Sequence, residues 1–122
     1  MAEIIIIDDD ENILNLFTLI LKQDGHSVRP AENGRIGILL ASEKTPDLVI
    51  TDIVMPEKEG LETISDLKEL SKSIKIIVIS GGGKISPDYY LKIAKSLGAD
   101  LTFQKPVDLK ILTSSVNKLL AQ

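Results

Sequence analysis

Residues 4–11 read Ile4-Ile5-Ile6-Ile7-Asp8-Asp9-Asp10-Glu11, and this stretch decides the fold because an apolar run ends abruptly in acidic residues. Strands of a parallel sheet are buried on both faces and therefore read as continuous apolar runs. Three further apolar runs also end in a polar residue: Leu48–Thr51 at Asp52, Ile74–Ile79 at Ser80, and Leu101–Gln104 at Lys105. Open parallel sheets bind their ligands at the carboxyl ends of the strands. We therefore expect these polar residues to meet in one crevice.

Segments with a helical spacing of apolar residues separate the runs, so the sequence predicts five strands that are each followed by a helix. This alternation is typical of a parallel sheet covered by helices. The expected strands are Glu3–Ile7, Ser27–Pro30, Leu48–Thr51, Ile74–Ile79 and Asp100–Gln104. The expected helices are Glu11–Gln23, Gly34–Glu43, one that opens at Gly60, one from Ser86 or Pro87 to Leu97, and one that Asp108 caps and that ends near Leu120. We expect a single α/β domain over residues 1–122.

The composition is that of an ordinary globular protein, with 43% apolar residues, 26% charged residues and no cysteine. A formal net charge of -4 argues against nucleic acid or an anionic membrane as the main partner. No apolar stretch approaches the length of a membrane span, and the first residues lack the basic segment of a secretory signal. We therefore expect a cytoplasmic protein without an attached output domain.

Asp8 and Asp9 directly follow the first strand and are candidate metal ligands. Adjacent carboxylates repel each other, and a bound cation removes that repulsion. An oxygen-rich site that retains water suits Mg²⁺, whereas the spacing of the acidic residues excludes an EF-hand. An acidic run at a helix start can instead favour the helix macrodipole, and we assign Asp10 and Glu11 to that role.

Asp52 is the candidate nucleophile. It follows an apolar strand and precedes a short loop that Pro56 stiffens, so its carboxylate should be held at the crevice. An aspartate can attack phosphorus to give an aspartyl phosphate, a reaction that needs mainly positioning and charge neutralisation. Lys105 would bring a positive charge to the phosphoryl group. Taken alone, each residue also fits an ordinary solvated side chain.

Ser80 precedes three glycines, which lack the Cβ that would keep backbone amides away from a ligand. The Ser80 hydroxyl and the Gly81 amide are therefore candidate donors to phosphoryl oxygens. From these residues alone, a glycine turn with no special role for Ser80 is an equal alternative. The segment is not a P-loop, because no Gly-Lys-Ser or Gly-Lys-Thr follows it.

Four motifs follow one another in a characteristic order and spacing. They are Ile4–Ile7 with Asp8-Asp9, Asp52-Ile53-Val54-Met55-Pro56 with Gly60, Ile79-Ser80-Gly81, and Gly98-Ala99-Asp100 leading to Lys105-Pro106. Over essentially its whole length the chain thereby resembles the receiver domain of two-component response regulators. The resemblance implies the flavodoxin-like fold, a doubly wound parallel sheet of five strands in the order 2-1-3-4-5.

The resemblance also implies a role for each site residue. Asp52 would accept phosphate from a histidine kinase or phosphotransfer protein, and the chain would catalyse only its own phosphoryl transfer and dephosphorylation. The Mg²⁺ ligands would be Asp8, Asp9, Asp52 and the backbone carbonyl of Val54. Ser80, Gly81, Lys105 and the Val54 backbone would bind the phosphoryl group. An output protein would dock on the fourth helix, fifth strand and fifth helix, or phosphate would pass onward in a relay.

Some residues depart from the family pattern. Thr102 stands where the family usually carries an aromatic residue that turns inward on phosphorylation, and strand alternation sends the adjacent Phe103 to the opposite face. Tyr89 and Tyr90 are other candidates to read the switch, with ordinary packing as the alternative. Extra length within Gly81–Pro87 predicts a mobile, atypical loop. Val54 and Gly82 are candidate positions for tuning dephosphorylation, with loop packing as the alternative, and neither offers a polar side chain.

Two other functions fit parts of the sequence. A haloacid-dehalogenase-like phosphatase would use Asp8 as its nucleophile, because Asp8-Asp9-Asp10 resembles the Asp-x-Asp signature of that family. That interpretation leaves Asp52 unused, and only Asp108 follows Lys105 where an acidic pair is needed. The third function is a receiver-like binding module that is never phosphorylated.

Overall fold

The apolar runs form the strands of one parallel sheet. The computed structural model describes residues 2–52, 57–80 and 87–122. Its strands are β1 (Glu3–Ile7), β2 (Ser27–Ala31), β3 (Leu48–Asp52), β4 (Lys75–Ser80) and β5 (Leu101–Gln104). Its helices are α1 (Glu11–Gln23), α2 (Gly34–Glu43), α3 (Glu57–Leu70), α4 (Pro87–Leu97) and α5 (Leu109–Leu120).

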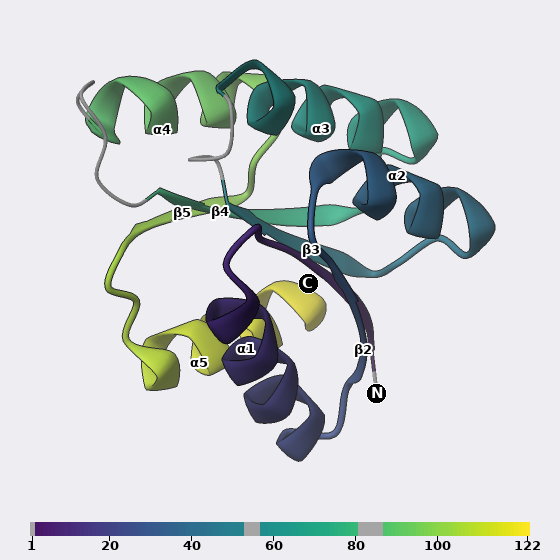
Figure 1. Cartoon of the computed structure of the whole chain (residues 1–122), viewed down its shortest axis with the longest axis vertical. Coiled ribbons are helices and arrows are strands. Elements are labelled where there is room, and N and C mark those ends of the chain that lie inside the picture. The colour runs from purple at the N-terminus through teal and green to yellow at the C-terminus, as the bar shows by residue number, and fades with distance from the viewer. Residues whose placement is uncertain (1, 53–56, 81–86) are drawn as a thin grey trace.

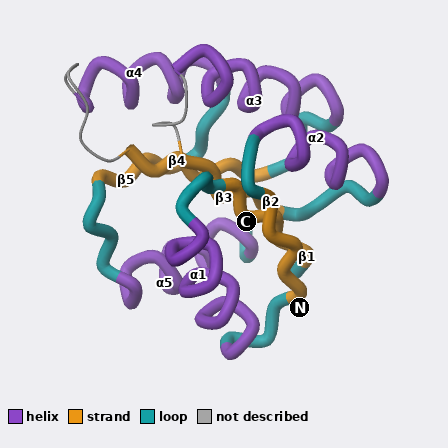
Figure 2. The backbone as a smooth tube through the Cα atoms, viewed as in Figure 1, coloured by secondary structure: helices purple, strands orange, loops and turns teal. Residues whose placement is uncertain are grey.

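The strand order is β2-β1-β3-β4-β5, and every neighbouring pair is parallel. Helices α1 and α5 cover one face of the sheet, and α2, α3 and α4 cover the other (Figure 1). Figure 2 shows the same strands as a central layer between the two groups of helices. The predicted fold class is therefore confirmed.

The isoleucine run of β1 contributes to two separate cores. Ile4 and Ile6 pack beneath α1 and α5, whereas Ile5 and Ile7 pack beneath the helices of the other face. All four side chains are essentially inaccessible to solvent, and burying each contributes roughly 2 kcal/mol relative to exposure. Gly37 brings α2 close to β1, since a Cβ at this position would run into the Ile7 side chain.

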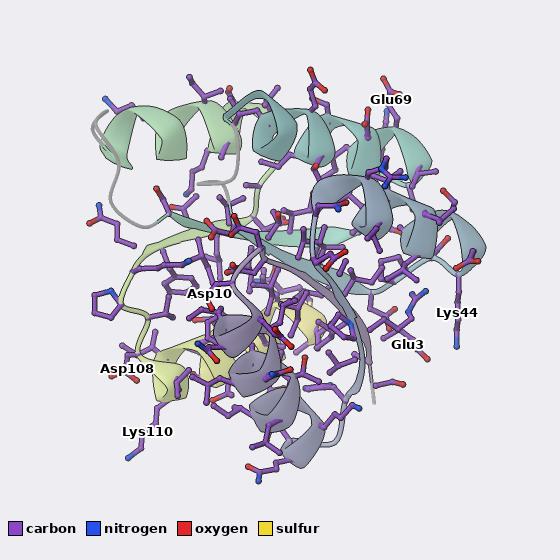
Figure 3. The ribbon with its side chains drawn as sticks, in the orientation of Figure 1. Glu3, Asp10, Lys44, Glu69, Asp108 and Lys110 are labelled. Carbon is purple, nitrogen blue, oxygen red and sulfur yellow. The ribbon has the colours of Figure 1, made fainter. Side chains whose placement is uncertain are left out.

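Acidic residues cap the two helices that share a face. The Asp10 carboxylate accepts the backbone N–H of Asn12 at 2.9 Å, as predicted for the start of α1. Asp108 likewise accepts the N–H of Lys110 at 2.9 Å at the start of α5. Both caps are labelled in Figure 3. Each satisfies a donor that the helix itself leaves without a partner.

One predicted boundary was wrong. Helix α3 begins at Glu57 and not at Gly60. A glycine is a poor guide to a helix start, whereas acidic residues such as Glu57 and Glu59 favour the first turn. The other predicted bounds agree with the structure to within one residue. Among the helices of the described ranges, none combines the length and apolarity that crossing a membrane requires.

Candidate functional site

Asp8 lies just beyond β1, and its carboxylate is buried at the carboxyl edge of the sheet. Only 3% of the residue surface is exposed, whereas the adjacent Asp9 is exposed. The Asp8 N–H donates to the Ala31 carbonyl of β2 at 3.1 Å, and Asp8 Oδ1 accepts the Asp10 N–H at 2.8 Å. These bonds fix both the backbone and the side chain of Asp8 at the strand end.

Asp52 is the last residue of β3 and is also 3% exposed. Lys105 Nζ donates to Asp52 Oδ2 at 2.8 Å and to Asp8 Oδ2 at 3.4 Å. Lys105 follows β5, so its side chain reaches past the end of β4 to join residues of two other strands. Its backbone N–H donates to the Ser80 carbonyl at 2.8 Å, which anchors the lysine to the end of β4.

The charges at this edge perturb one another. Burial raises the pKa of the Asp8 carboxyl from 3.8 to about 6, and the negative charge of Asp52 adds to the rise. The Asp10 N–H and the Lys105 ammonium oppose it. Burial lowers the pKa of Lys105, but the hydrogen bond and charge of Asp52, together with the charge of Asp8, leave it above its ordinary value. Lys105 therefore stays charged while part of the carboxylate charge remains uncompensated.

The chemistry of the donor groups fits a hard divalent cation. Asp8, Asp9 and Asp52 each offer a carboxylate oxygen, and these three oxygens lie within 4.8 Å of one another. Carboxylates held this close repel each other, and Lys105 supplies a single positive charge between two of them. Oxygen-only ligands with one solvent-exposed member suit Mg²⁺, which keeps several waters when it binds.

Ser80 lies at the same edge. It is the last residue of β4, is 3% exposed, and pairs in register with Gln104 of β5. Its neighbour Ile79 pairs with Asp52, which places the serine one position beyond the aspartate along the adjacent strand. The order of the strands thus places at one edge of the sheet the five residues whose side chains the sequence predicted for the site: Asp8, Asp9, Asp52, Ser80 and Lys105.

Several other predictions concern positions outside the described residues. These are the Val54 backbone, the amide of Gly81, the position of Gly82 and the expected mobility of the loop before Pro87. The structure describes the backbone of α4 from Pro87 onward, but it does not describe the side chains of Tyr89 and Tyr90. The roles assigned to these residues stay predictions.

Thr102 and Phe103 lie on opposite faces of the sheet, as strand alternation predicted. Phe103 packs with the core beneath α1 and α5. Thr102 pairs with Val78, whose side chain belongs to the core on the face that α4 covers. Phe103 therefore cannot replace an aromatic residue on the α4 side without a rotation of the strand.

One contributor to the site was missed from sequence. Asp10 was assigned only to the start of α1, yet its backbone N–H also orients the Asp8 carboxylate. The signal was available, since an aspartate side chain commonly accepts the N–H two residues further on. Asp10 therefore links the metal candidate Asp8 to the helix cap.

Comparison with known proteins assigns the chain and its fold to a family. The model of the family described as "response regulator receiver domain" matches residues 4–117. Protein PilH of Pseudomonas aeruginosa is 33% identical, with 99% of each chain covered. Chemotaxis protein CheY of Halobacterium salinarum is 31% identical over 97% of this chain and 96% of its own.

A solved structure shows the same similarity in three dimensions. The receiver domain protein from Clostridium thermocellum superposes with a TM-score of 0.89 at 28% identity and covers 99% of this chain. The match spans nearly the whole length of these small relatives, but only 27% of longer ones such as the transcriptional regulatory protein GlrR of Escherichia coli. Because the family model covers most of the chain, this protein belongs to the response regulator receiver domain family.

Proposed function

We propose that this protein is a phosphoacceptor switch in which Asp52 receives a phosphoryl group from a histidine kinase or phosphotransfer protein. The observation that carries the proposal is the buried Asp52 carboxylate, 2.8 Å from the Lys105 ammonium and within 4.8 Å of ligand oxygens of two further aspartates. Receiver domains are regulatory phosphoacceptors, and the family assignment supports this use of the site.

Transfer would occur by displacement at phosphorus. A bond forms between an Asp52 carboxylate oxygen and the phosphorus atom while the bond from phosphorus to the donor imidazole nitrogen breaks. The electron pair of the broken bond stays on that nitrogen, and the donor leaves as a neutral imidazole because its other ring nitrogen carries a proton. The protein has little covalent chemistry to perform, because positioning and charge stabilisation account for most of the catalysis.

Each site residue has a proposed part in that step. Asp8, Asp9, Asp52 and the Val54 carbonyl would hold Mg²⁺, which when bound neutralises charge on the phosphoryl oxygens. Lys105 would move from the Asp52 carboxylate to a phosphoryl oxygen, since phosphorylation consumes the carboxylate with which it pairs. The Ser80 hydroxyl and the Gly81 amide would donate to the remaining oxygens.

Lys105 also connects the site to the surface. It follows β5, and its ammonium is drawn inward by Asp52 and Asp8. A phosphoryl group on Asp52 would pull on the same ammonium and shift the end of β5. We infer that an output protein reads the change on the face of α4, β5 and α5, or that the phosphoryl group moves onward in a relay.

Intact mass spectrometry tests the proposal. The wild-type chain, incubated with acetyl phosphate and Mg²⁺, should gain the mass of one phosphoryl group, and Asp52→Asn should gain none. Asp8→Asn should also label poorly because its metal site is incomplete. The same incubation with EDTA in place of Mg²⁺ is the control for metal dependence.

The outcome separates the three candidate functions. Label retained in Asp52→Asn and lost in Asp8→Asn would favour a phosphatase that uses Asp8 as its nucleophile. Absence of any label on the wild type would favour a binding module that is never phosphorylated. The hydrogen bonds of Asp8 to Asp10 and Lys105 favour a fixed, supporting role for Asp8 over attack on a substrate.

A further inference from the structure

A hollow beside the phosphoacceptor site shares Asp9 with that site, and its other lining residues have no part in the chemistry proposed above. It lies at the carboxyl end of β2 and is lined by residues of α1 and α2, two helices that cover opposite faces of the sheet (Figure 1). Its volume is about 490 Å³, within the range of about 300–1,000 Å³ typical of ligand sites. It is large enough for one long side chain of a partner.

The hollow combines an apolar floor with a negative rim. Leu14, Pro30 and Ile36 supply apolar surface, whereas Asp9, Glu11 and Glu32 bring three carboxylates. Glu11 and Glu32 are exposed, and within the described ranges neither forms an ion pair. A bound Mg²⁺ would take the charge of Asp9, and the two glutamates would still keep the rim negative.

The position of the hollow next to Asp52 indicates which partner protein would contact it. Asp9 belongs both to the hollow and to the carboxylate trio around Asp52. A protein that presents a phosphohistidine to Asp52 must therefore contact the surface next to the hollow. An output protein on the face of α4, β5 and α5 would approach the opposite edge of the sheet, since β2 and β5 are its two outer strands.

We propose that this hollow receives a basic side chain, arginine in preference to lysine, from the phosphodonor protein. The inference rests on the proposed phosphoacceptor function, and it specifies which kind of side chain the phosphodonor protein would place in the hollow. The methylene stem of such a side chain packs on an apolar floor while its charged group stays with the rim. A guanidinium presents its donors in a fixed fork that matches carboxylates, which a lysine ammonium does not.

Phosphotransfer kinetics test the contact with a protein donor. Purified histidine kinases and phosphotransfer proteins of the source organism are first screened for the one that labels the wild type fastest. Glu32→Lys should slow that transfer about tenfold and weaken its dependence on salt, as the loss of a steering charge does. The rate of labelling by acetyl phosphate should stay within about twofold of wild type, because a donor this small does not contact the rim of the hollow.

Glu69→Lys is the matched control. Glu69 is exposed on α3, well away from the β2 edge (Figure 3). The Glu69→Lys substitution changes the net charge by the same amount as Glu32→Lys. It should leave both transfer from the protein donor and labelling by acetyl phosphate unchanged. Equal slowing by Glu69→Lys and Glu32→Lys would show that only net charge matters and would overturn the proposal.

A small probe tests the hollow without a donor. N-acetyl-arginine amide, titrated into ¹⁵N-labelled protein, should shift the backbone amides of Leu14, Glu32 and Ile36 with saturation in the millimolar range. N-acetyl-citrulline amide has almost the same shape without the charge and should not saturate. Glu32→Lys should weaken the arginine probe at least fivefold.

The two proposals fail in different ways. Equal binding of the arginine and citrulline probes, or a transfer rate that Glu32→Lys leaves unchanged, would overturn the basic-side-chain contact while phosphorylation of Asp52 stands. Absence of any phosphoryl adduct on the wild type would overturn the phosphoacceptor function and, with it, the phosphodonor as occupant.

Discussion

Replacing Asp8 by asparagine is expected to stabilise the metal-free protein at neutral pH. The Asp8 carboxyl is buried and stands near the negative charge of Asp52, and its pKa is raised to about 6. A raised pKa means that folding opposes ionisation of this group. The asparagine side chain of this variant would keep an oxygen that accepts the Asp10 N–H and would carry no charge.

The size of the effect follows from the pKa. One pKa unit corresponds to about 1.4 kcal/mol, so a rise from 3.8 to about 6 amounts to roughly 3 kcal/mol. This cost is absent below pH 3.8, grows as the pH rises, and is complete above about pH 6. We expect Asp8→Asn to raise the free energy of unfolding by about 2 to 3 kcal/mol at pH 7.5 and by almost nothing at pH 3.5.

Urea denaturation in EDTA at the two pH values measures the difference. Asp66→Asn, at an exposed position of α3, is the control and should change the free energy by less than about 0.5 kcal/mol at both. Addition of Mg²⁺ should stabilise the wild type and leave Asp8→Asn unaffected, because binding to the folded state alone adds stability. A gain of equal size at pH 3.5 and 7.5, or no gain at either, would refute the electrostatic explanation.

Three further substitutions test other contacts. Lys105→Met leaves the Asp8 and Asp52 carboxylates without their ammonium partner, and we expect a loss on the order of 2 kcal/mol in EDTA; unchanged urea denaturation would contradict the pairing. Gly37→Ala should cost about 1 to 3 kcal/mol through its clash with Ile7. Ile7→Val should recover part of that loss in the double variant, and strict additivity would argue against direct contact. Thr102→Ala should leave labelling of Asp52 by acetyl phosphate within about twofold of wild type, whereas a larger loss would give the threonine hydroxyl a part in holding the phosphoryl group.

Sequence patterns identified the sheet because four of its five strands are apolar runs that end in polar residues. Ile4–Ile7 is an example, since both of its faces are buried and no alternation disguises it. The order of strands came from the family resemblance, because apolar runs alone do not say which strands are neighbours. The start of α3 was misplaced since Gly60 was given more weight than the acidic residues that precede it.

The site was predictable as a set of residues but not as a set of contacts. Asp8 and Asp9 look alike in the sequence, yet one is buried and the other exposed, and only the packing around the end of β1 separates them. The bond from Lys105 to Asp52 joins residues 53 positions apart, and its length depends on how far the lysine reaches past β4. No local pattern encodes such a distance.

The charges of the site indicate why phosphorylation should require a divalent cation. Three carboxylates and one ammonium give a formal charge of -2 when Asp8, Asp9 and Asp52 are ionised. Formation of the aspartyl phosphate removes the charge of Asp52 but brings about -1.5 to -2 on the phosphoryl group, so the site becomes more negative. Lys105 alone cannot balance this charge around Asp8 and Asp52, from which water is largely excluded. A divalent cation bound at Asp8 and Asp9 would bring the net charge of the phosphorylated site close to -1. Hydrogen bonds from the Ser80 hydroxyl and from backbone amides would stabilise this remaining charge.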